Sequence, residues 1–528
     1  MANKNRLLIL LSFFVFLFIV IILRLVDVQI IRHSFYEEKS KGQRTRLINL
    51  AAQRGEIVDR NGNILATSLD TYSVYLYKKG WLGRKLSLAE AKKLQAENSK
   101  EISILPEKKR VYPKQKLLAQ AIGFVGLDNH GLSGIELAFD EYLRGREGKV
   151  ITEGDPKGRE LYGALRELKS GEDGMSLTLT IDENIQYVAE REIAEQVKKS
   201  SALSGMCVVM DARTGEILAL ASKPDFNPNA YQKYDKKLWH PRFLDPYEPG
   251  STFKLITVAS ALEKRVVTVD IKLKALDSIT VGGKVIQNSH NVKWPGGTIT
   301  LSRMLEESIN TGAVQVALKL GKEKFYQSIK DFGFGHKSKF GLWGESGGIV
   351  NHWKYWNQPD IAMISFGQTI AVTPMQLLTA VASFANGGYL LTPLLVKRIE
   401  SKDGKFVKVF SNDYDKRVIG AQTADWMKKL MLNVVVHGSG RRARMEAFKV
   451  CGKTGTAQKT VPGGRGYLKD HYIASFIGFA PYDNPRLVAL VIVDDPRGGY
   501  WGETVCGPVF KRVVEYSLRY LNVEPDML

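Results

Sequence analysis

The stretch YEPGSTFKLITVASALEK, Tyr247–Lys264, places a serine and a lysine three residues apart at the start of a predicted helix. Residues at this spacing share one helix face, so the Lys254 amine can approach the Ser251 hydroxyl. A serine hydroxyl is a poor nucleophile at neutral pH and needs a base beside it. The pair therefore favours a nucleophile with its base, although each residue alone is more typical of a helix cap or a solvated lysine.

Two further motifs carry the same chemistry. SIN at 308–310 opens another predicted helix, and KTGT at 453–456 lies on a predicted strand. They follow Ser251 at separations of about 55 and then 145 residues, the order of the S-x-x-K, S-x-N and K-T-G motifs in serine β-lactamases and penicillin-binding proteins. Each motif alone is weak, but the three together indicate acyl transfer.

The chemistry assigns catalytic roles to three residues: Ser251, Lys254 and Ser308. Lys254 accepts the proton of Ser251 only when its amine is neutral, so burial or a nearby cation must lower its pKa. Lys453 can supply that positive charge and can also hold a substrate carboxylate. Ser308 can relay a proton toward the leaving amine.

The substrate is expected to lie along the strand of the third motif. There Gly455 leaves room for an extended peptide, while the Asn310 amide orients the substrate backbone. The backbone N–H groups of Ser251 and Thr456 form the predicted oxyanion hole. The predicted substrate-binding residues are Asn310, Lys453, Thr454, Gly455 and Thr456.

Strands on either side of a long helical middle predict a catalytic domain over 202–528. Residues 205–222 contain two apolar strands joined by an Asp/Gly turn, and three more strands lie within 448–495. The first and last strands must pair, which predicts an α/β sandwich: an antiparallel sheet flanked by helices that are inserted between its halves. Thr373 and Pro374 mark the start of one of these helices.

The N-terminus predicts a membrane anchor. Residues 7–23 carry no charge, and 7–26 approach the thickness of a bilayer. No small-x-small cleavage site follows, so the span is expected to remain uncleaved, with residues 1–6 as a cytoplasmic tail. More positive charges follow the span than precede it, and the orientation must therefore come from the chemistry.

Residues 40–195 mix short strands and helices, which predicts a separate α+β domain. Asn61-Gly62 indicates a hairpin. A helix is expected from Ser133 to near Gly145, and a longer one after a strand, with Asp182 near its N-cap.

The formal charge of +20 calls for an anionic partner, either nucleic acid or an anionic membrane or polymer surface. Cys207, Cys451 and Cys506 have no metal-ligand spacing, so we expect buried, unreactive thiols and neither a metal nor a cofactor. The GKT at 452–454 resembles a phosphate-binding loop, but Ala447 stands where that loop needs glycine. Nucleic-acid binding would explain the charge but not the three motifs.

The sequence resembles the class B penicillin-binding proteins, the monofunctional peptidoglycan transpeptidases. The similarity covers nearly the whole chain and is carried by RGEIVDRNGNILA, GLSGIE, LTLTIDENIQ, EPGSTFK, SINT, SFGQTIAVTPMQL and GKTGTAQ. It implies a non-catalytic pedestal (dimerisation-type) domain that contacts partners, and a β-lactamase-like domain that crosslinks stem peptides ending in D-Ala-D-Ala outside the cytoplasmic membrane. It further implies acylation of Ser251 by β-lactams, and as partners a SEDS-family (FtsW-like) glycosyltransferase and other membrane division proteins.

Within this family, YEPGSTFK and SINTGA are closer to the division (septal, FtsI-type) branch, because elongation proteins more often carry YPPGS and an aspartate at the position of Asn310. RVYP and AQAIGFVG are shared with both branches and with sporulation relatives. No PASTA-like sequence follows the final helix, which weakens the sporulation assignment. The alternatives are an elongation transpeptidase, a carboxypeptidase or β-lactamase of the same fold, and a non-catalytic membrane-tethered scaffold.

Overall fold

The computed structural model describes residues 2–50, 52–76, 80–97, 102–153, 167–169, 171–289, 296–412, 416–461, 463–464 and 466–526. The chain forms two compact units. One contains Met1–Gln53 and Gly145–Asp173, and the other contains Arg54–Arg144 and Gly174–Leu528.

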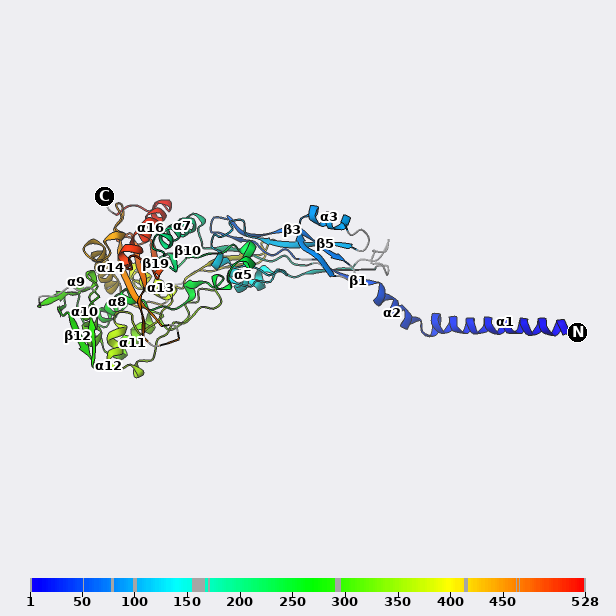
Figure 1. The fold of residues 1–528 in the computed structure, drawn as a ribbon, viewed down its shortest axis with the longest axis horizontal. Coiled ribbons are helices and arrows are strands. Elements are labelled where there is room, and N and C mark those ends of the chain that lie inside the picture. Colours follow the sequence, from blue (N-terminus) through cyan, green and yellow to red (C-terminus); the bar gives the residue numbers. More distant parts are fainter. Residues whose placement is uncertain are drawn as a thin grey trace. The chain divides into compact units, whose positions relative to one another are not determined.

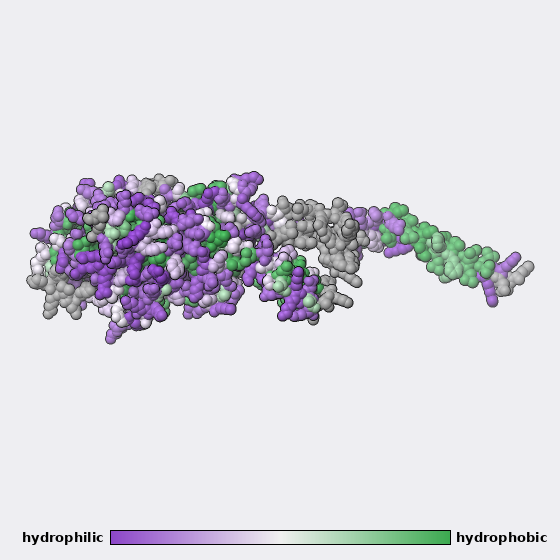
Figure 2. All heavy atoms as spheres, turned by 90° about the horizontal axis from the view of Figure 1, so that it is seen from above, coloured by the Kyte–Doolittle hydropathy of each residue, from purple (hydrophilic) through white to green (hydrophobic). Residues whose placement is uncertain are grey.

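The first unit begins with a long apolar helix. Helix α1 (Ala2–Val26) continues through a π-helical turn, and Lys4–Ile31 is long and apolar enough to cross a membrane. Its side chains are exposed and form a continuous hydrophobic surface along the helix (Figure 2). Helix α2 (His33–Arg44) follows, and the unit ends in an antiparallel sheet of β1 (Thr45–Leu50), β6 (Gly148–Glu153) and β7 (Glu167–Lys169). The predicted span over 7–26 falls within α1.

The second unit contains a five-stranded antiparallel sheet in the order β10-β9-β19-β18-β17. Strand β9 pairs with β19, which confirms that the strands before and after the helical middle meet. Side chains alternate between its two faces: Val208 packs on one side, and Cys207 and Val209 on the other. The strands are β9 (Ser204–Asp211), β10 (Ile217–Lys223), β17 (Cys451–Thr460), β18 (Tyr467–Ala480) and β19 (Leu487–Asp494).

Helices cover both faces of this sheet. On one face lie α7 (Glu183–Lys199) and α16 (Gly507–Tyr520), which are side by side in Figure 1. The other face packs against α8 (Lys254–Glu263), α13 (Pro374–Ala385) and α14 (Ala421–Val436). The remaining helices and short strands of this region are α9 (Leu301–Glu306), α10 (Asn310–Leu320), α11 (Lys322–Asp331), α12 (Gln358–Ile364), α15 (Gly502–Val505), β11 (Lys272–Lys274), β12 (Ser278–Val281), β13 (Lys284–Gln287) and β14 (Thr298–Thr300).

Two predicted helix starts are confirmed by their hydrogen bonds. The Asp182 carboxylate accepts hydrogen bonds from the backbone N–H groups of Asn184 and Ile185, which caps α7. Thr373 and Gln376 form a capping box at α13, with Pro374 in its first turn.

A second sheet combines strands of the region that the sequence assigned to the pedestal with two strands, β15 and β16, of the region assigned to the catalytic domain. Its strand order is β16-β15-β8-β2-β3-β4, and β5 also pairs with β3, along Thr67–Leu76. The predicted hairpin at Asn61-Gly62 is confirmed by the antiparallel pairing of β2 with β3. The elements are β2 (Ile57–Val58), β3 (Ile64–Leu76), β4 (Gly80–Leu86), α3 (Leu88–Glu97), β5 (Ile102–Val111), α4 (Ala119–Ile122), β8 (Ser176–Leu179), β15 (Val396–Glu400) and β16 (Val407–Val409).

The single helix predicted from Ser133 to near Gly145 is wrong. The structure has two short helices, α5 (Gly134–Ala138) and α6 (Asp140–Leu143), because Phe139 leaves the helical conformation at φ −116° and ψ 22°. The break lies beside a tertiary contact that local sequence patterns do not encode, since Arg54 binds carboxylates on both sides of it.

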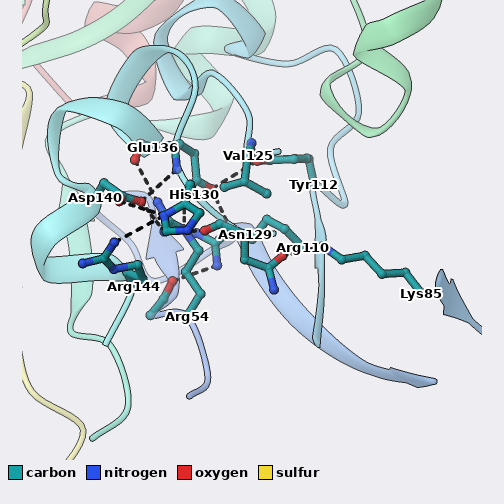
Figure 3. Close-up of polar contacts among 12 residues, drawn as sticks. Arg54, Lys85, Arg110, Tyr112, Val125, Asn129, His130, Glu136, Asp140 and Arg144 are labelled. Atoms are coloured by element: carbon teal, nitrogen blue, oxygen red, sulfur yellow. Dashed lines mark hydrogen bonds and ion pairs between the residues drawn. The ribbon is translucent and has the colours of Figure 1, made fainter. Parts of the chain in front are cut away.

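Arg54 belongs to a buried ionic network that joins three segments distant in the sequence (Figure 3). The Glu136 carboxylate accepts from Arg54 Nε at 2.7 Å and from Arg110 Nε at 2.6 Å, and Arg54 Nη1 also pairs with Asp140 at 2.6 Å. Tyr112 donates its hydroxyl to Glu136 at 3.2 Å. Burial alone would lower the pKa of Arg54, but Glu136 and Asp140 more than offset this and raise it. Arg54, Arg110 and Glu136 thus form one buried ion-paired cluster.

We expect Glu136→Gln to destabilise the second unit by about 3–5 kcal/mol, because two buried guanidinium groups lose their shared carboxylate while the side-chain shape is kept. The midpoint of thermal denaturation of the full chain in detergent measures this. The control is Glu141→Gln, which removes an exposed carboxylate from the neighbouring helix. Equal midpoints for the two variants would contradict the prediction.

Candidate active site

Ser251 lies in a 3₁₀ turn, Gly250–Phe253, that leads directly into α8. Gly250 adopts φ +58° and donates its N–H to the carbonyl of Gly367. A Cβ on Gly250 would lie 3.1 Å from the Cβ of Ala457 and 3.2 Å from the carbonyl oxygen of Thr456. Glycine at this position therefore permits the left-handed turn and the close approach of β17 to the serine.

The predicted contact between Ser251 and Lys254 is confirmed. Lys254 Nζ lies 3.1 Å from Ser251 Oγ and donates to the carbonyl of Ser308 at 2.5 Å. The Lys254 side chain is fully buried. Burial, and next the charge of Lys453, lower the pKa of Lys254 well below its ordinary value. A neutral amine at this position can accept the proton of Ser251.

Ser308 lies between the two lysines. It occupies the break between α9 and α10 at φ +57°, and its Oγ accepts from Lys453 Nζ at 2.9 Å and from Lys254 Nζ at 3.2 Å. Lys453 is also fully buried, and this burial lowers its pKa to about 7. Because the pKa of Lys254 is lowered further by Lys453, we infer that Lys254 loses its proton first. The site then holds one neutral amine and one ammonium on either side of a hydroxyl.

Asn310 is the first residue of α10, and its amide lies at the edge of a cleft. Its Nδ2 donates to the Gln287 carbonyl at 2.9 Å and more weakly to Ser289 Oγ at 3.4 Å. Its Oδ1 is buried and accepts no hydrogen bond from the residues that the structure describes. That oxygen can accept an N–H from a bound peptide.

Two hollows meet at Ser251. The larger is a cleft of about 460 Å³, and the smaller has a volume of about 140 Å³; Ser251 and Thr456 line both. Asn310 lines only the larger one, together with an aromatic wall of Tyr467, Tyr472, Tyr500 and Trp501. Within that wall the rings of Tyr472 and Tyr500 stack at 4.0 Å. The smaller hollow includes the polar residues Ser289, Ser308, Ser439, Thr454, Glu503 and Thr504.

The reason predicted for Gly455 is wrong. A Cβ at this position would meet Ser475 Oγ at 2.3 Å and Thr252 Cγ2 at 2.9 Å, so the space beside Gly455 is already filled by protein. Glycine lets β17 pack against the turn that carries Ser251, and it does not open a channel for the substrate. The neighbouring residues Thr454 and Thr456 line the hollows instead.

Three parts of the site were not among the predicted residues: Ser439, the aromatic wall and Glu503. Ser439 Oγ lies 3.0 Å from Thr454 Oγ1 and so places a second hydroxyl beside that of the third motif. The run of glycines and aromatic residues at 498–502, after the last strand, contains two residues of the wall and could have indicated it. Nothing local to Ser439 or Glu503 indicates that they face Ser251.

The three cysteines lie in the core and are free thiols. Burial raises the pKa of Cys207 to about 12 and also raises those of Cys451 and Cys506. Cys451 precedes Lys453 on β17, but its Sγ donates to the Lys428 carbonyl. These observations fit the expectation of buried, unreactive thiols.

Comparison with known proteins gives the class of this fold and site. Residues 205–515 match the penicillin binding protein transpeptidase domain, and residues 77–179 match the penicillin-binding protein dimerisation domain. The chain is 35% identical to stage V sporulation protein D of Bacillus subtilis, over 99% of this chain and 86% of that protein. It is 32% identical to peptidoglycan D,D-transpeptidase FtsI of Escherichia coli, over 81% of this chain and 70% of that protein.

A solved structure is also similar. Penicillin binding protein 3 of Mycobacterium tuberculosis, complexed with ampicillin, has a TM-score of 0.75 and 28% identity, covering 90% of this chain and 97% of its own. The fold is thus that of a penicillin-binding transpeptidase. The chain belongs to the class B penicillin-binding proteins and is a peptidoglycan D,D-transpeptidase.

We expect the second-order rate of acylation by penicillin to be bell-shaped in pH. It is expected to rise with pH as Lys254 loses its proton, and to fall as pH passes about 7, where Lys453 loses the charge that is predicted to hold the carboxylate. Stopped-flow measurement of acylation of the full chain tests this, with the thermal midpoint recorded at each pH as a control for folding. A flat profile between about pH 6 and 9 would contradict the assignment of Lys453.

Proposed function

We propose that Ser251, Lys254 and Ser308 are the catalytic residues of this transpeptidase. Ser251 Oγ attacks the carbonyl carbon of the penultimate D-Ala and passes its proton to neutral Lys254. The proton reaches the leaving amine through Ser308, the bond to the terminal D-Ala breaks, and an acyl-enzyme remains. The observation that carries this proposal is the 3.1 Å contact of Ser251 Oγ with the fully buried Lys254 amine.

The donor peptide is proposed to run along β17, which ends the five-stranded sheet. Lys453, Thr454 and Ser439 offer an ammonium and two hydroxyls to the terminal carboxylate. Asn310 orients the peptide backbone from the other side of Ser251. The N–H groups of Ser251 and Thr456 form the oxyanion hole, since both residues line both hollows. A β-lactam would acylate the same serine.

We further propose a septal role, in division. YEPGSTFK and Asn310 are typical of the division branch, and an FtsI protein is among the relatives. The observation in favour of a second candidate, a role in sporulation, is the 35% identity to stage V sporulation protein D over nearly the whole chain.

The location follows from the chemistry. Peptidoglycan lies outside the cytoplasmic membrane, so α1 would anchor the chain there with the catalytic domain on the outer side and residues 1–6 in the cytoplasm. The proposed partners are a SEDS-family glycosyltransferase and other membrane division proteins. An elongation role would change the partners but not the chemistry at Ser251.

We expect Ser251→Ala in the full chain to abolish the covalent penicillin adduct, a loss of at least about 10³-fold, because the attacking oxygen is removed. Mass spectrometry of the intact chain and its peptides measures the adduct and its position. Ser260→Ala is the matched control, since that buried hydroxyl bonds to the Ile256 carbonyl farther along the same helix. An adduct on another residue would overturn the assignment. Rapid turnover of penicillin by the unmodified chain would indicate a β-lactamase.

Depletion of the protein in its own organism is expected to give filaments, and a fluorescent fusion is expected to collect at the division site. The Ser251→Ala chain should fail to complement, whereas full complementation would favour a non-catalytic scaffold. Normal vegetative division with a defect confined to sporulation would favour the second candidate. Rounded or bulging cells would indicate elongation.

A further inference from the structure

Glu503, a residue with a carboxylate side chain, lines the smaller hollow at the nucleophile. The hollow is shared with Ser251, Ser308, Ser439 and Thr454, and the Glu503 side chain is half-buried. The Glu503 side chain has no hydrogen bond or ion pair with any residue that the structure describes. Among the described residues, it is the only acidic one that lines either hollow.

The position of Glu503 is fixed by close backbone packing. Gly502, which begins α15, donates its N–H to Thr456 Oγ1 at 3.2 Å. A Cβ on Gly502 would lie 2.3 Å from the Ser475 carbonyl oxygen and 2.5 Å from that of Gly455. Glycine therefore lets α15 contact β17 directly, and Val505 is buried one turn later. The backbone that carries Glu503 is therefore held beside the third motif by packing on both sides of this residue.

The order of the reaction decides which substrate reaches this hollow. The leaving D-Ala carboxylate is proposed to bind at Thr454 and Ser439, which line only the smaller hollow. The acceptor amine must attack the acyl carbon from the side that the leaving amine has vacated. It therefore enters the smaller hollow, where Glu503 lies. A side-chain amine has an ordinary pKa of about 10.4, so the acceptor arrives as an ammonium ion.

We propose that Glu503 is a specificity-determining residue that binds the ammonium group of the acceptor strand and favours aminolysis of the acyl-enzyme over hydrolysis. This inference rests on the proposed function of Ser251 and identifies its second substrate as a cationic amine. The ammonium first releases one proton to solvent. The neutral nitrogen then bonds to the acyl carbon, a second proton passes through Ser308 and Lys254 to Ser251 Oγ, and the ester bond breaks.

A carboxylate beside an acyl-enzyme can also activate water, which would make the chain a carboxypeptidase. The two roles predict opposite effects of removing the charge. If Glu503 binds the acceptor, its loss lowers transfer to a cationic amine and leaves hydrolysis in place. If Glu503 activates water, its loss lowers hydrolysis instead.

The test compares the unmodified full chain in detergent with Glu503→Gln. A thioester donor ending in D-Ala acylates the enzyme, and the products of transfer and of hydrolysis are quantified. The acceptors are Nα-acetyl-lysine amide, which is cationic at neutral pH, and hydroxylamine, which is neutral. Glu446→Gln is the matched control, because Glu446 is exposed and lines neither hollow.

For Glu503→Gln we expect the ratio of transfer to hydrolysis to fall about tenfold with the lysine derivative, the loss of one charge-assisted hydrogen bond, and to change less than about twofold with hydroxylamine. Glu503→Asp should retain part of the transfer to the lysine derivative. An unchanged ratio, an equal fall with both acceptors, or a fall in hydrolysis alone would overturn the inference.

Acylation by penicillin involves no acceptor and is measured on every variant. An unmodified chain that penicillin does not acylate would count against the proposed function itself. A chain that is acylated but shows no effect of Glu503 would count only against the acceptor site. If Glu503→Gln is not acylated, Glu503→Asp provides the same comparison, with transfer to the lysine derivative as the readout.

Discussion

Two buried lysines share one serine hydroxyl, and the rest of the site depends on this arrangement. Lys254 and Lys453 both contact Ser308 Oγ, and neither amine is accessible to solvent. Two ammonium ions this close in a buried site would repel each other strongly, so one amine must be neutral. The neutral amine, that of Lys254, lies against Ser251, and the remaining charge is that of Lys453, on the side of Thr454. Burial would thus separate the proposed roles of base and carboxylate anchor between two chemically identical side chains.

This burial requires three chain segments to pack more closely than ordinary side chains allow. Gly250, Gly455 and Gly502 each lie at a contact where a Cβ would overlap or crowd a neighbouring segment. Together they bring the turn of Ser251, the strand of Lys453 and helix α15 to one place. A larger side chain at any of them would move a segment by tenths of an ångström or more, and the lysine amines would lose their contacts with Ser308. The glycines therefore support catalysis indirectly, because they let the segments that carry the site pack closely.

Local patterns predicted the strands of the five-stranded sheet, two capped helix starts and the three motifs of the site, because each of these depends on residues near in sequence. Contacts between distant segments were not predictable in the same way. The helix expected through Phe139 is broken beside the contacts of Arg54, a residue of another motif. Ser439 and Glu503 reach the cleft only because their segments fold against β17. The room for substrate predicted at Gly455 is filled by Ser475 and Thr252, which belong to segments distant in sequence.

With the roles proposed for the two hollows, one serine would treat a peptide and a β-lactam differently. In a peptide, the cleaved amine belongs to a separate D-Ala that can diffuse away and leave the smaller hollow to the acceptor. In a β-lactam, the cleaved nitrogen stays attached to the acyl group through the rest of the molecule, together with its carboxylate. If that carboxylate stays with Thr454 and Ser439, the smaller hollow remains occupied and no acceptor reaches the carboxylate of Glu503. A long-lived adduct then needs no special chemistry, because the same contacts that position the donor keep the second substrate out.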